Sequence, residues 1–367
     1  MKKKTPNKPV TLRDVAQAAG VSLQAVSLVV NERAGVGEET RAKIKQIIAK
    51  LGYAPSSSAQ ALRGNSTKTL VVIYPGTPLG RLPASGYLEE VLNGICVAAN
   101  AHGYYVLLHA LASGDLLDIE RQRRADAVIT VVSDLDVPQL SALERMNLPV
   151  ISVQRPTPSA ITVRADNRAG TRLAVEFLVR RGHSKIAYFG GDLNTYAGRE
   201  RFEGYCDGLR GAGIHVDSHL VHHYVSNAEV SMMMREPNVP PELTDVLEVA
   251  LGLLSRKERP TGVVCFSDLR AVATIRAART LGLRVPEDVS VIGFNNFTLA
   301  AMVDPPLTTV HFPAFEIGKT AAQTAISAAL GTLEHRDEVV LPVSLVIRSS
   351  SGACPMAEQK EKNETRW

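Results

Sequence analysis

The sequence has few aromatic residues, few cysteines and no long apolar run. Aromatic residues make up 5% of its 367 residues, and its four cysteines, Cys96, Cys206, Cys265 and Cys354, lie far apart. Isolated cysteines argue against a disulfide framework or a Cys-pair metal site, and they fit a reducing cytoplasm. No apolar run reaches the roughly 18 residues of a membrane span, and the basic start MKKKTPNK leads into a polar segment instead of a signal-peptide core. We therefore expect a soluble, cytoplasmic protein with no membrane partner.

Recognisable catalytic motifs are also lacking. The chain contains no GxSxG nucleophile elbow, no phosphate-binding GxxxxGK[ST] and no HExxH. Four histidines, His215, His219, His222 and His223, could form a metal site with Asp217 or could belong to a variable surface loop. Alternation along a strand sends His222 and His223 to opposite faces, which argues against a shared metal. We expect no enzymatic activity, no cofactor, no metal and no catalytic residue.

Charge is distributed unevenly along the chain. Residues 1–68 carry 12 lysines and arginines against four acidic residues, whereas the whole chain has a net charge of only +4. The remainder is therefore mildly acidic. A small basic module on an acidic body indicates a polyanion partner for the first part alone, with a solvated basic tail as the alternative.

Residues 11–53 are patterned as three short helices. Thr11 is a candidate cap for the first helix, whose apolar positions recur at helical spacing up to a stop at Gly20. Ser22 is placed to cap the second helix, and Gly52 ends the third. Two helices joined by a tight turn and braced by a third form the helix-turn-helix unit that DNA-binding proteins use.

The segment that follows, PSSSAQALRGNSTK at 55–68, is rich in Ser, Pro and Gly at its edges and carries Ala59 and Leu62 in the middle. About eight residues are too few for a stable isolated helix in water. We therefore expect a linker that becomes helical only when a partner holds it.

From residue 69 onward, apolar strands alternate with amphipathic helices. The expected strands include TLVVIY, YYVLLH, DAVITVV, PVISV, KIAYFGG, TGVVCF, DVSVIGF, LTTVH and VVLPVSLVI. Buried strands followed by crossover helices indicate parallel sheets that are covered on both faces. About ten strands favour two lobes over one. The charged, unpatterned end of the chain, 349–367, is expected to be a disordered tail.

Two groups of motifs resemble the LacI/GalR family. TLRDVAQAAGVSLQAVSLVVN and ETRAKIKQIIAKLGYAPSSSAQAL are similar to its headpiece and hinge, and DNRAGTRLAVEFLVRRGHSKIAYFGG, GRERFEGYCDGL and PTGVVCFSDLRAVATIRAARTLGLRVPEDVSVIGF are similar to its core. The resemblance covers residues 11–348. It implies an all-α helix-turn-helix headpiece and a two-lobed α/β core of the type I periplasmic-binding-protein kind, with parallel sheets, in a protein that usually dimerises.

The implied domains are a headpiece at 1–54, a hinge at 55–68 and an effector-binding and dimerisation core at 69–348. We place lobe one at about 69–164 and 295–323, and lobe two at about 165–294 and 324–348.

The resemblance and helix geometry together name candidate DNA-binding residues. A recognition helix presents its N-terminal side chains to base edges. Gln24 suits a bidentate contact to adenine and Leu23 an apolar contact, for example to a thymine methyl, whereas Leu28 departs from the polar or basic residue common in the family. Leu62 matches the minor-groove wedge of the family, with Ala59 beside it. The full set is Thr11, Ser22, Leu23, Gln24, Ala25, Ser27, Leu28, Asn31, Tyr53, Ala59 and Leu62.

Candidate effector-binding residues follow from the family pocket at the carboxyl ends of the strands. They are Tyr87, Leu88, Gln154, Arg199, Ser267, Asp268 and Asn295. Arg199 is the principal candidate because a guanidinium can hold two hydroxyls, a carboxylate or a phosphate, and a salt bridge to Glu203 is the alternative. Members that bind neutral sugars often have carboxylates where this chain has Gln154 and Asn295. That difference favours, slightly, an acidic or phosphorylated sugar.

We therefore expect a sequence-specific DNA-binding transcriptional regulator. As a homodimer it would repress from a near-palindromic double-stranded operator under the control of a sugar-like effector. A transporter's solute-binding protein would require a signal peptide and no headpiece, and an enzyme would require an activated catalytic group. Repression versus activation, and inducer versus corepressor, stay open.

Overall fold

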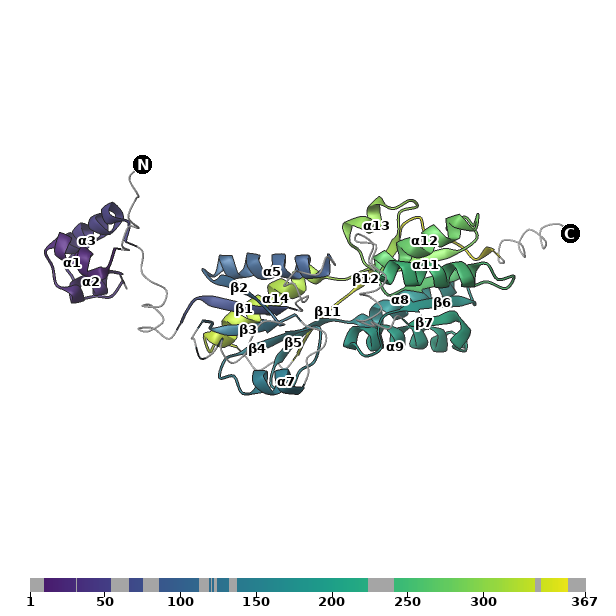
Figure 1. The fold of residues 1–367 in the computed structure, drawn as a ribbon, viewed down its shortest axis with the longest axis horizontal. Coiled ribbons are helices and arrows are strands. Elements are labelled where there is room, and N and C mark those ends of the chain that lie inside the picture. The colour runs from purple at the N-terminus through teal and green to yellow at the C-terminus, as the bar shows by residue number, and fades with distance from the viewer. Residues whose placement is uncertain are drawn as a thin grey trace, which may run out of the picture. The chain divides into compact units, whose positions relative to one another are not determined.

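The computed structural model describes residues 10–30, 32–53, 66–74, 86–111, 119, 121, 124–131, 137–223, 241–333 and 338–355 (Figure 1). The chain divides into two compact units, residues 1–67 and residues 68–367. Within the described ranges, no helix is both long enough and apolar enough to cross a membrane.

The first unit contains α1 (Leu12–Ala19), α2 (Leu23–Val30) and α3 (Glu38–Leu51), which confirms the predicted helix-turn-helix. Thr11 forms a reciprocal capping box with Asp14, whose carboxylate accepts the Thr11 N–H at 2.7 Å. Gly20 ends α1 in the left-handed region, at φ 67°, where glycine has no Cβ penalty. Apolar side chains that share the inner faces are fully buried, namely Val15, Val26 and Ile44.

Lobe one of the second unit is built on a parallel six-stranded sheet in the order β11-β5-β4-β3-β1-β2. Its strands are β1 (Thr69–Tyr74), β2 (Tyr105–Ala110), β3 (Ala127–Thr130), β4 (Val150–Val153), β5 (Ile161–Ala165) and β11 (Glu338–Leu341). Helices α5 (Tyr87–Ala101) and α14 (Ala314–Ala329) cover one face, and α7 (Val137–Glu144) lies on the other (Figure 1).

Lobe two contains the second six-stranded sheet, in the order β12-β10-β9-β8-β6-β7, in which only β12 runs antiparallel to its neighbour. Its strands are β6 (Ile186–Gly190), β7 (Val221–His223), β8 (Gly262–Cys265), β9 (Ser290–Asn295), β10 (Thr308–His311) and β12 (Ser344–Val346). Helices α8 (Asn167–Arg180) and α9 (Tyr196–Gly211) pack on one face, and α11 (Pro241–Leu254) and α12 (Asp268–Thr280) on the other. Short elements are α13 (Thr298–Met302) and the 3-10 helix Ser218–Leu220.

The predicted points at which the chain passes between lobes are partly wrong. The first passage, after β5, lies where it was expected. The second lies at 312–313 and not at 295, because β10 pairs in parallel with β9 and so stays in lobe two. The third lies at 342–343 and not at 323, because α14 runs on to Ala329 and β11 pairs with β5. Strand pairing, which periodicity does not reveal, decides these boundaries.

The expected disordered tail is also wrong for its first residues. Ser350 is fully buried, its hydroxyl donates to the Val291 carbonyl at 2.6 Å, and its own carbonyl accepts the Val291 N–H at 2.8 Å. Thr308 donates its N–H to the same hydroxyl. Residues 349–355 therefore complete lobe two, whereas 356–367 lie outside the described residues.

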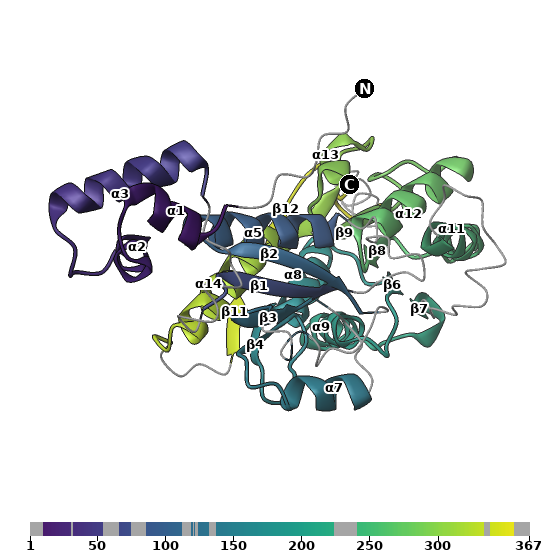
Figure 2. The same cartoon turned by 60° about the vertical axis from the view of Figure 1, so that its left-hand side comes forward.

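Helices α5 and α14 run side by side over lobe one (Figure 2) and approach each other at two glycines. A Cβ on Gly94 would lie 2.0 Å from the Phe315 carbonyl oxygen, and a Cβ on Gly318 would lie 2.0 Å from the Val91 carbonyl oxygen. These atoms belong to the backbone, so they cannot turn aside as a side chain can. Each helix thus depends on a glycine in the other for close packing.

Gly94→Ala should lower the free energy of unfolding of the second unit by about 1–3 kcal/mol, because the added methyl forces the two helix backbones apart. Gly252→Ala in α11 is the matched control, since a Cβ there meets nothing within 4 Å. That variant should be neutral or slightly stabilising, by up to about 1 kcal/mol of helix propensity. Equal denaturant midpoints for the two variants would contradict the packing argument.

Candidate functional site

The exposed end of α2 provides the candidate DNA-reading surface. Val26 and Val29 are buried in the headpiece core, while Ser22, Leu23 and Gln24 are exposed, with Leu23 41% exposed. The Ser22 hydroxyl accepts the Ala25 N–H at 3.1 Å and so caps the helix. Side-chain periodicity therefore leaves the first turn of α2 exposed, which is the part of a recognition helix that faces bases in helix-turn-helix proteins.

The other DNA-binding candidates are distributed around this surface. Thr11 is exposed and engaged in its capping box, whereas Ala25, Ser27 and Leu28 are half-buried on α2. Tyr53 is half-buried and packs against the headpiece core. Three candidates, Asn31, Ala59 and Leu62, lie outside the described residues.

In the second unit, Arg201 of α9 is a buried cation at the carboxyl ends of the lobe-two strands. Its side chain is 5% exposed. The guanidinium donates from Nε to the Asn167 side-chain oxygen at 2.8 Å and from Nη1 to the Phe266 carbonyl at 2.5 Å. Its Cζ lies 3.6 Å from the ring centroid of Phe294, 4.4 Å from that of Phe266 and 5.6 Å from that of Phe312. Aromatic faces and neutral oxygens thus surround the charge.

The electrostatics of Arg201 are unusual for an arginine. Burial lowers its pKa to about 9, which still leaves it charged at neutral pH. Among the described residues, no carboxylate forms a hydrogen bond or an ion pair with it. A buried charge without an opposite partner is costly, and such groups concentrate at functional sites.

Lobe one meets this cation through Tyr87 and Gln154. Tyr87, the first residue of α5, packs edge-on against Phe312 with 5.7 Å between ring centroids, and burial raises its pKa despite the opposing effect of Arg201. Gln154 follows β4 with a positive φ of 70°. Its Oε1 accepts a hydrogen bond from Asn167 Nδ2 at 3.1 Å. Its buried Nε2 has no partner among the described residues.

Asn167 links the two lobes at this point. Its amide nitrogen donates to Gln154 of lobe one, while its amide oxygen accepts from Arg201 of lobe two. Because a side-chain amide has a fixed donor end and a fixed acceptor end, these two bonds determine its orientation. Asn167 was not among the predicted site residues, although its position at the start of α8, after a strand, is typical of a site residue.

The remaining effector candidates have structural tasks. The two carboxylate oxygens of Asp268 accept from the Thr309 hydroxyl at 2.5 Å and from the Phe297 N–H at 2.9 Å. Burial raises the pKa of Asp268 to about 6. The carboxylate therefore holds the loop in which Asn295 and Asn296 both have positive φ, 118° and 59°.

Ser267 and Leu88 also serve local structure. Ser267 caps α12 by accepting the Arg270 N–H at 3.4 Å. Leu88 is 3% exposed and packs in the core of lobe one. Of the predicted set, Tyr87 and Gln154 are thus the residues that the structure brings to the buried cation.

Arg199 lies outside this cluster, whereas Arg201, two residues further along α9, lies within it. Arg199 is exposed, and its Nη1 donates to the Leu193 and Asn194 carbonyls at 2.9 and 2.8 Å. The alternative salt bridge to Glu203 is not formed either, since Glu203 binds Arg168. The spacing of residues along α9 could have identified Arg201 from the sequence. The small or aromatic residues Gly198, Gly204, Tyr205 and Gly208 define the inner face of α9, and Arg201 shares their spacing whereas Arg199 does not.

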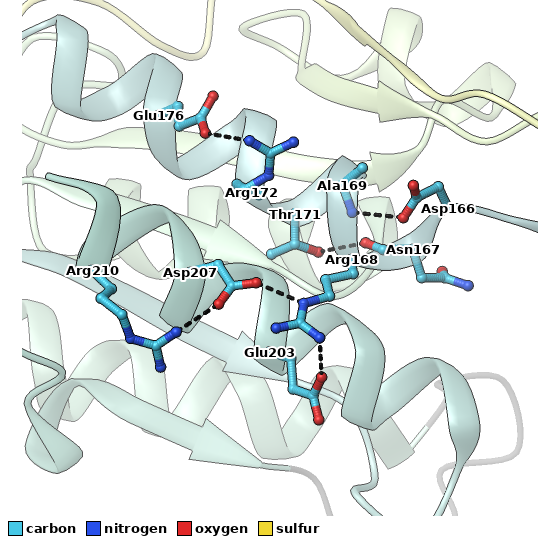
Figure 3. Close-up of polar contacts among 10 residues, drawn as sticks. All are labelled: Asp166, Asn167, Arg168, Ala169, Thr171, Arg172, Glu176, Glu203, Asp207 and Arg210. Carbon is cyan, nitrogen blue, oxygen red and sulfur yellow. Dashed lines mark hydrogen bonds and ion pairs between the residues drawn. The ribbon is translucent and has the colours of Figure 1, made fainter.

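Helices α8 and α9 hold Asn167 and Arg201 in register. Arg168 of α8 reaches across to α9, where it binds Asp207 at 2.6 Å and Glu203 at 2.8 Å (Figure 3). A Cβ on Gly204 would lie 2.2 Å from the Arg168 carbonyl oxygen, so the backbones are in close contact. These ion pairs are exposed, so each of them contributes little to the stability of the fold. The glycine contact is therefore the main constraint.

His222 and His223 point to opposite faces of the sheet, as alternation along a strand predicts. His222 Nε2 lies 3.0 Å from the Asp245 carboxylate, while His223 packs edge-on against Phe202, with ring centroids 4.6 Å apart. No set of three metal-ligating side chains converges within the part of the chain that the structure describes.

Each of the two units matches a known protein family model. Residues 11–56 match the family model of bacterial regulatory proteins of the lacI family, and residues 175–351 match that of the periplasmic binding protein-like domain. The HTH-type transcriptional repressor PurR of Photobacterium profundum is 30% identical over 348 residues, which cover 93% of this chain and 98% of that protein. The repressor CytR of Escherichia coli (strain K12) is 29% identical and covers 97% of this chain and 100% of its own.

Solved structures agree with this placement. The lac repressor dimer bound to operator and the anti-inducer ONPF superposes with a TM-score of 0.78 at 28% identity, covering 94% of this chain and 100% of that one. The transcriptional regulator CelR in complex with cellobiose gives a TM-score of 0.66 at 28% identity, with 93% and 100% coverage. The headpiece, the two-sheet core and these similarities lead to one conclusion: this chain belongs to the LacI family of bacterial regulatory proteins.

Proposed function

We propose that this protein is a transcriptional repressor whose affinity for operator DNA is controlled by a small molecule bound beside Arg201, between its two lobes. The observation that carries this proposal is a buried cation where the lobes meet, which has no ion-pair partner among the described residues, on the same chain as a helix-turn-helix whose second helix has an exposed first turn. A ligand in contact with both lobes has a different affinity for each arrangement of them, which is what regulation requires.

Arg201, Gln154 and Tyr87 are the residues we assign to the effector. Arg201 offers a forked donor for hydroxyl or acidic oxygens, and the Gln154 amide offers the unpaired buried nitrogen described above. Sugars present many hydroxyls, and the related CelR was solved with cellobiose. A sugar or sugar derivative is therefore the effector class we favour. Coupling of typical size changes operator affinity about 5- to 150-fold, or about 1–3 kcal/mol.

Homodimer formation is supported by exposed apolar side chains on both lobes. Tyr105, Leu107 and Leu108 of β2 and Val97 of α5 are exposed on lobe one, with Tyr105 74% exposed. Met302 of α13 is 77% exposed on lobe two. Exposed apolar surface is a common feature of protein interfaces, and β2 is also an edge strand of its sheet. A two-fold dimer reads a near-palindromic operator, with Leu62 of each hinge as the proposed minor-groove wedge.

Gln24→Ala should weaken binding to an operator obtained by selection from random DNA by about 1–3 kcal/mol and should relax the preference for adenine at one position of each half-site. Gln24 is exposed, so stability should not change. Gln46→Ala, an exposed glutamine on α3, is the control and should bind as the wild type does. Fluorescence anisotropy at fixed salt measures both affinities. An unchanged base preference for Gln24→Ala would remove Gln24 from the reading set.

Arg201→Met should abolish effector binding, whereas Arg199→Met should not, because only Arg201 faces the interlobe cluster. A thermal-shift screen of the wild type against neutral sugars, sugar acids and sugar phosphates identifies the effector, since a ligand at 100 times its Kd adds about 2.7 kcal/mol. The two variants are then titrated with the compound found. Operator affinity measured in parallel shows that each variant is folded. Loss of binding in Arg199→Met with retention in Arg201→Met would contradict the assignment.

A further inference from the structure

A second guanidinium lies beside Arg201 in lobe two. Arg270, in the first turn of α12, is 2% exposed and belongs to the largest fully buried side chains of the protein. Its Nη1 donates to the Gly190 carbonyl at the end of β6. Neither helix periodicity nor the family resemblance singled out this residue. A fully buried arginine is rare enough to require a reason.

Arg201 and Arg270 converge on the same aromatic ring. The Cζ of Arg201 lies 4.4 Å from the Phe266 centroid, and the Cζ of Arg270 lies 5.6 Å from it. Each guanidinium also donates to a carbonyl at a strand end, Arg201 to Phe266 just after β8 and Arg270 to Gly190 of β6. These strands are neighbours in the sheet. The positive charge of Arg270 contributes to the lowered pKa of Arg201.

Two buried polar groups near the pair have no hydrogen-bond partner among the described residues. The Tyr188 hydroxyl is fully buried, interacts electrostatically with both guanidiniums and has no hydrogen-bond partner among the described residues. The Gln154 amide nitrogen beyond Asn167 is likewise without a partner there. The nearby Asp268 already accepts from Thr309 and Phe297. Two guanidiniums, a phenol hydroxyl and an amide nitrogen beside one carboxylate fit a ligand rich in acceptors and negative charge.

We propose that Arg270 is a second binding residue of the effector site and that the effector carries a doubly charged acidic group of the phosphate monoester type. This inference rests on the proposed function. Arg201 and Arg270 approach the group from neighbouring strand ends, and the Tyr188 hydroxyl supplies a third donor. A phosphate dianion offers three acceptor oxygens to these donors. A neutral sugar would supply hydroxyls but would bring no negative charge to the two guanidiniums.

Inorganic phosphate serves as the probe, because it carries the proposed group without assuming the rest of the effector. At pH 8 and constant ionic strength, replacing chloride with about 10 mM phosphate should raise the midpoint of thermal unfolding of the full chain by about 3 °C or more. Arg270→Met should abolish this rise. Arg276→Met removes an exposed arginine from the same helix and should keep it. Phosphate also stabilises folded proteins in general because it is excluded from their surface. That effect raises the midpoint of all variants alike, so only the difference between variants reports binding.

Tyr188→Phe provides a second test that does not disturb a buried charge. Removing the unpaired hydroxyl should leave the fold intact and weaken phosphate binding about 10-fold, as loss of one hydrogen bond to a charged group does. No phosphate-specific rise in the wild type, or an equal rise in wild type and Arg270→Met, would overturn the inference. Operator binding is measured on the same samples. Intact operator binding without a phosphate response refutes this inference alone, whereas a phosphate response without operator binding refutes the repressor proposal.

Discussion

The guanidinium of Arg201 is the charge around which the core of this protein is organised. Taking a cation out of water costs several kcal/mol unless other groups replace its hydration. Here the aromatic faces of Phe266 and Phe294, one backbone carbonyl and one amide oxygen do so. None of these contacting groups carries a negative charge, and Asp268, whose charge favours the charged form of Arg201, forms no ion pair with it among the described residues. We propose that a bound anion or polar ligand supplies the missing partner and so contributes to the driving force of ligand binding.

Several features far from the charge follow from the need to hold it in place. The close contact of α8 and α9 at Gly204 fixes the separation between Asn167 and Arg201. Asn167 then extends the network to Gln154 of lobe one through one further hydrogen bond. Asp268, which was predicted to bind ligand directly, anchors the loop after β9. The site is therefore a connected set of contacts that spans both lobes.

Sequence reasoning was most successful where local chemistry determines structure. The capping box at Thr11, the glycine stops and the buried strands are each specified by a few neighbouring residues. It failed where a choice depends on distant partners. Arg199 and Arg201 are two residues apart and so face different sides of α9. Family position alone did not separate them, although the spacing of the small residues of α9 indicates that Arg201 is the inner one. The lobe boundaries failed for the same reason, because pairing of β10 with β9 and of β11 with β5 is a long-range property.

The central claim is that operator binding and the Arg201 site are coupled, and coupling between two binding sites is reciprocal. Operator binding must therefore change the interlobe site even when no effector is present. Hydrogen–deuterium exchange of the full chain, with and without its selected operator, measures this directly. The account predicts altered exchange in the start of α8, in α9 and in the loop after β9. Changes confined to residues 1–67 would contradict it.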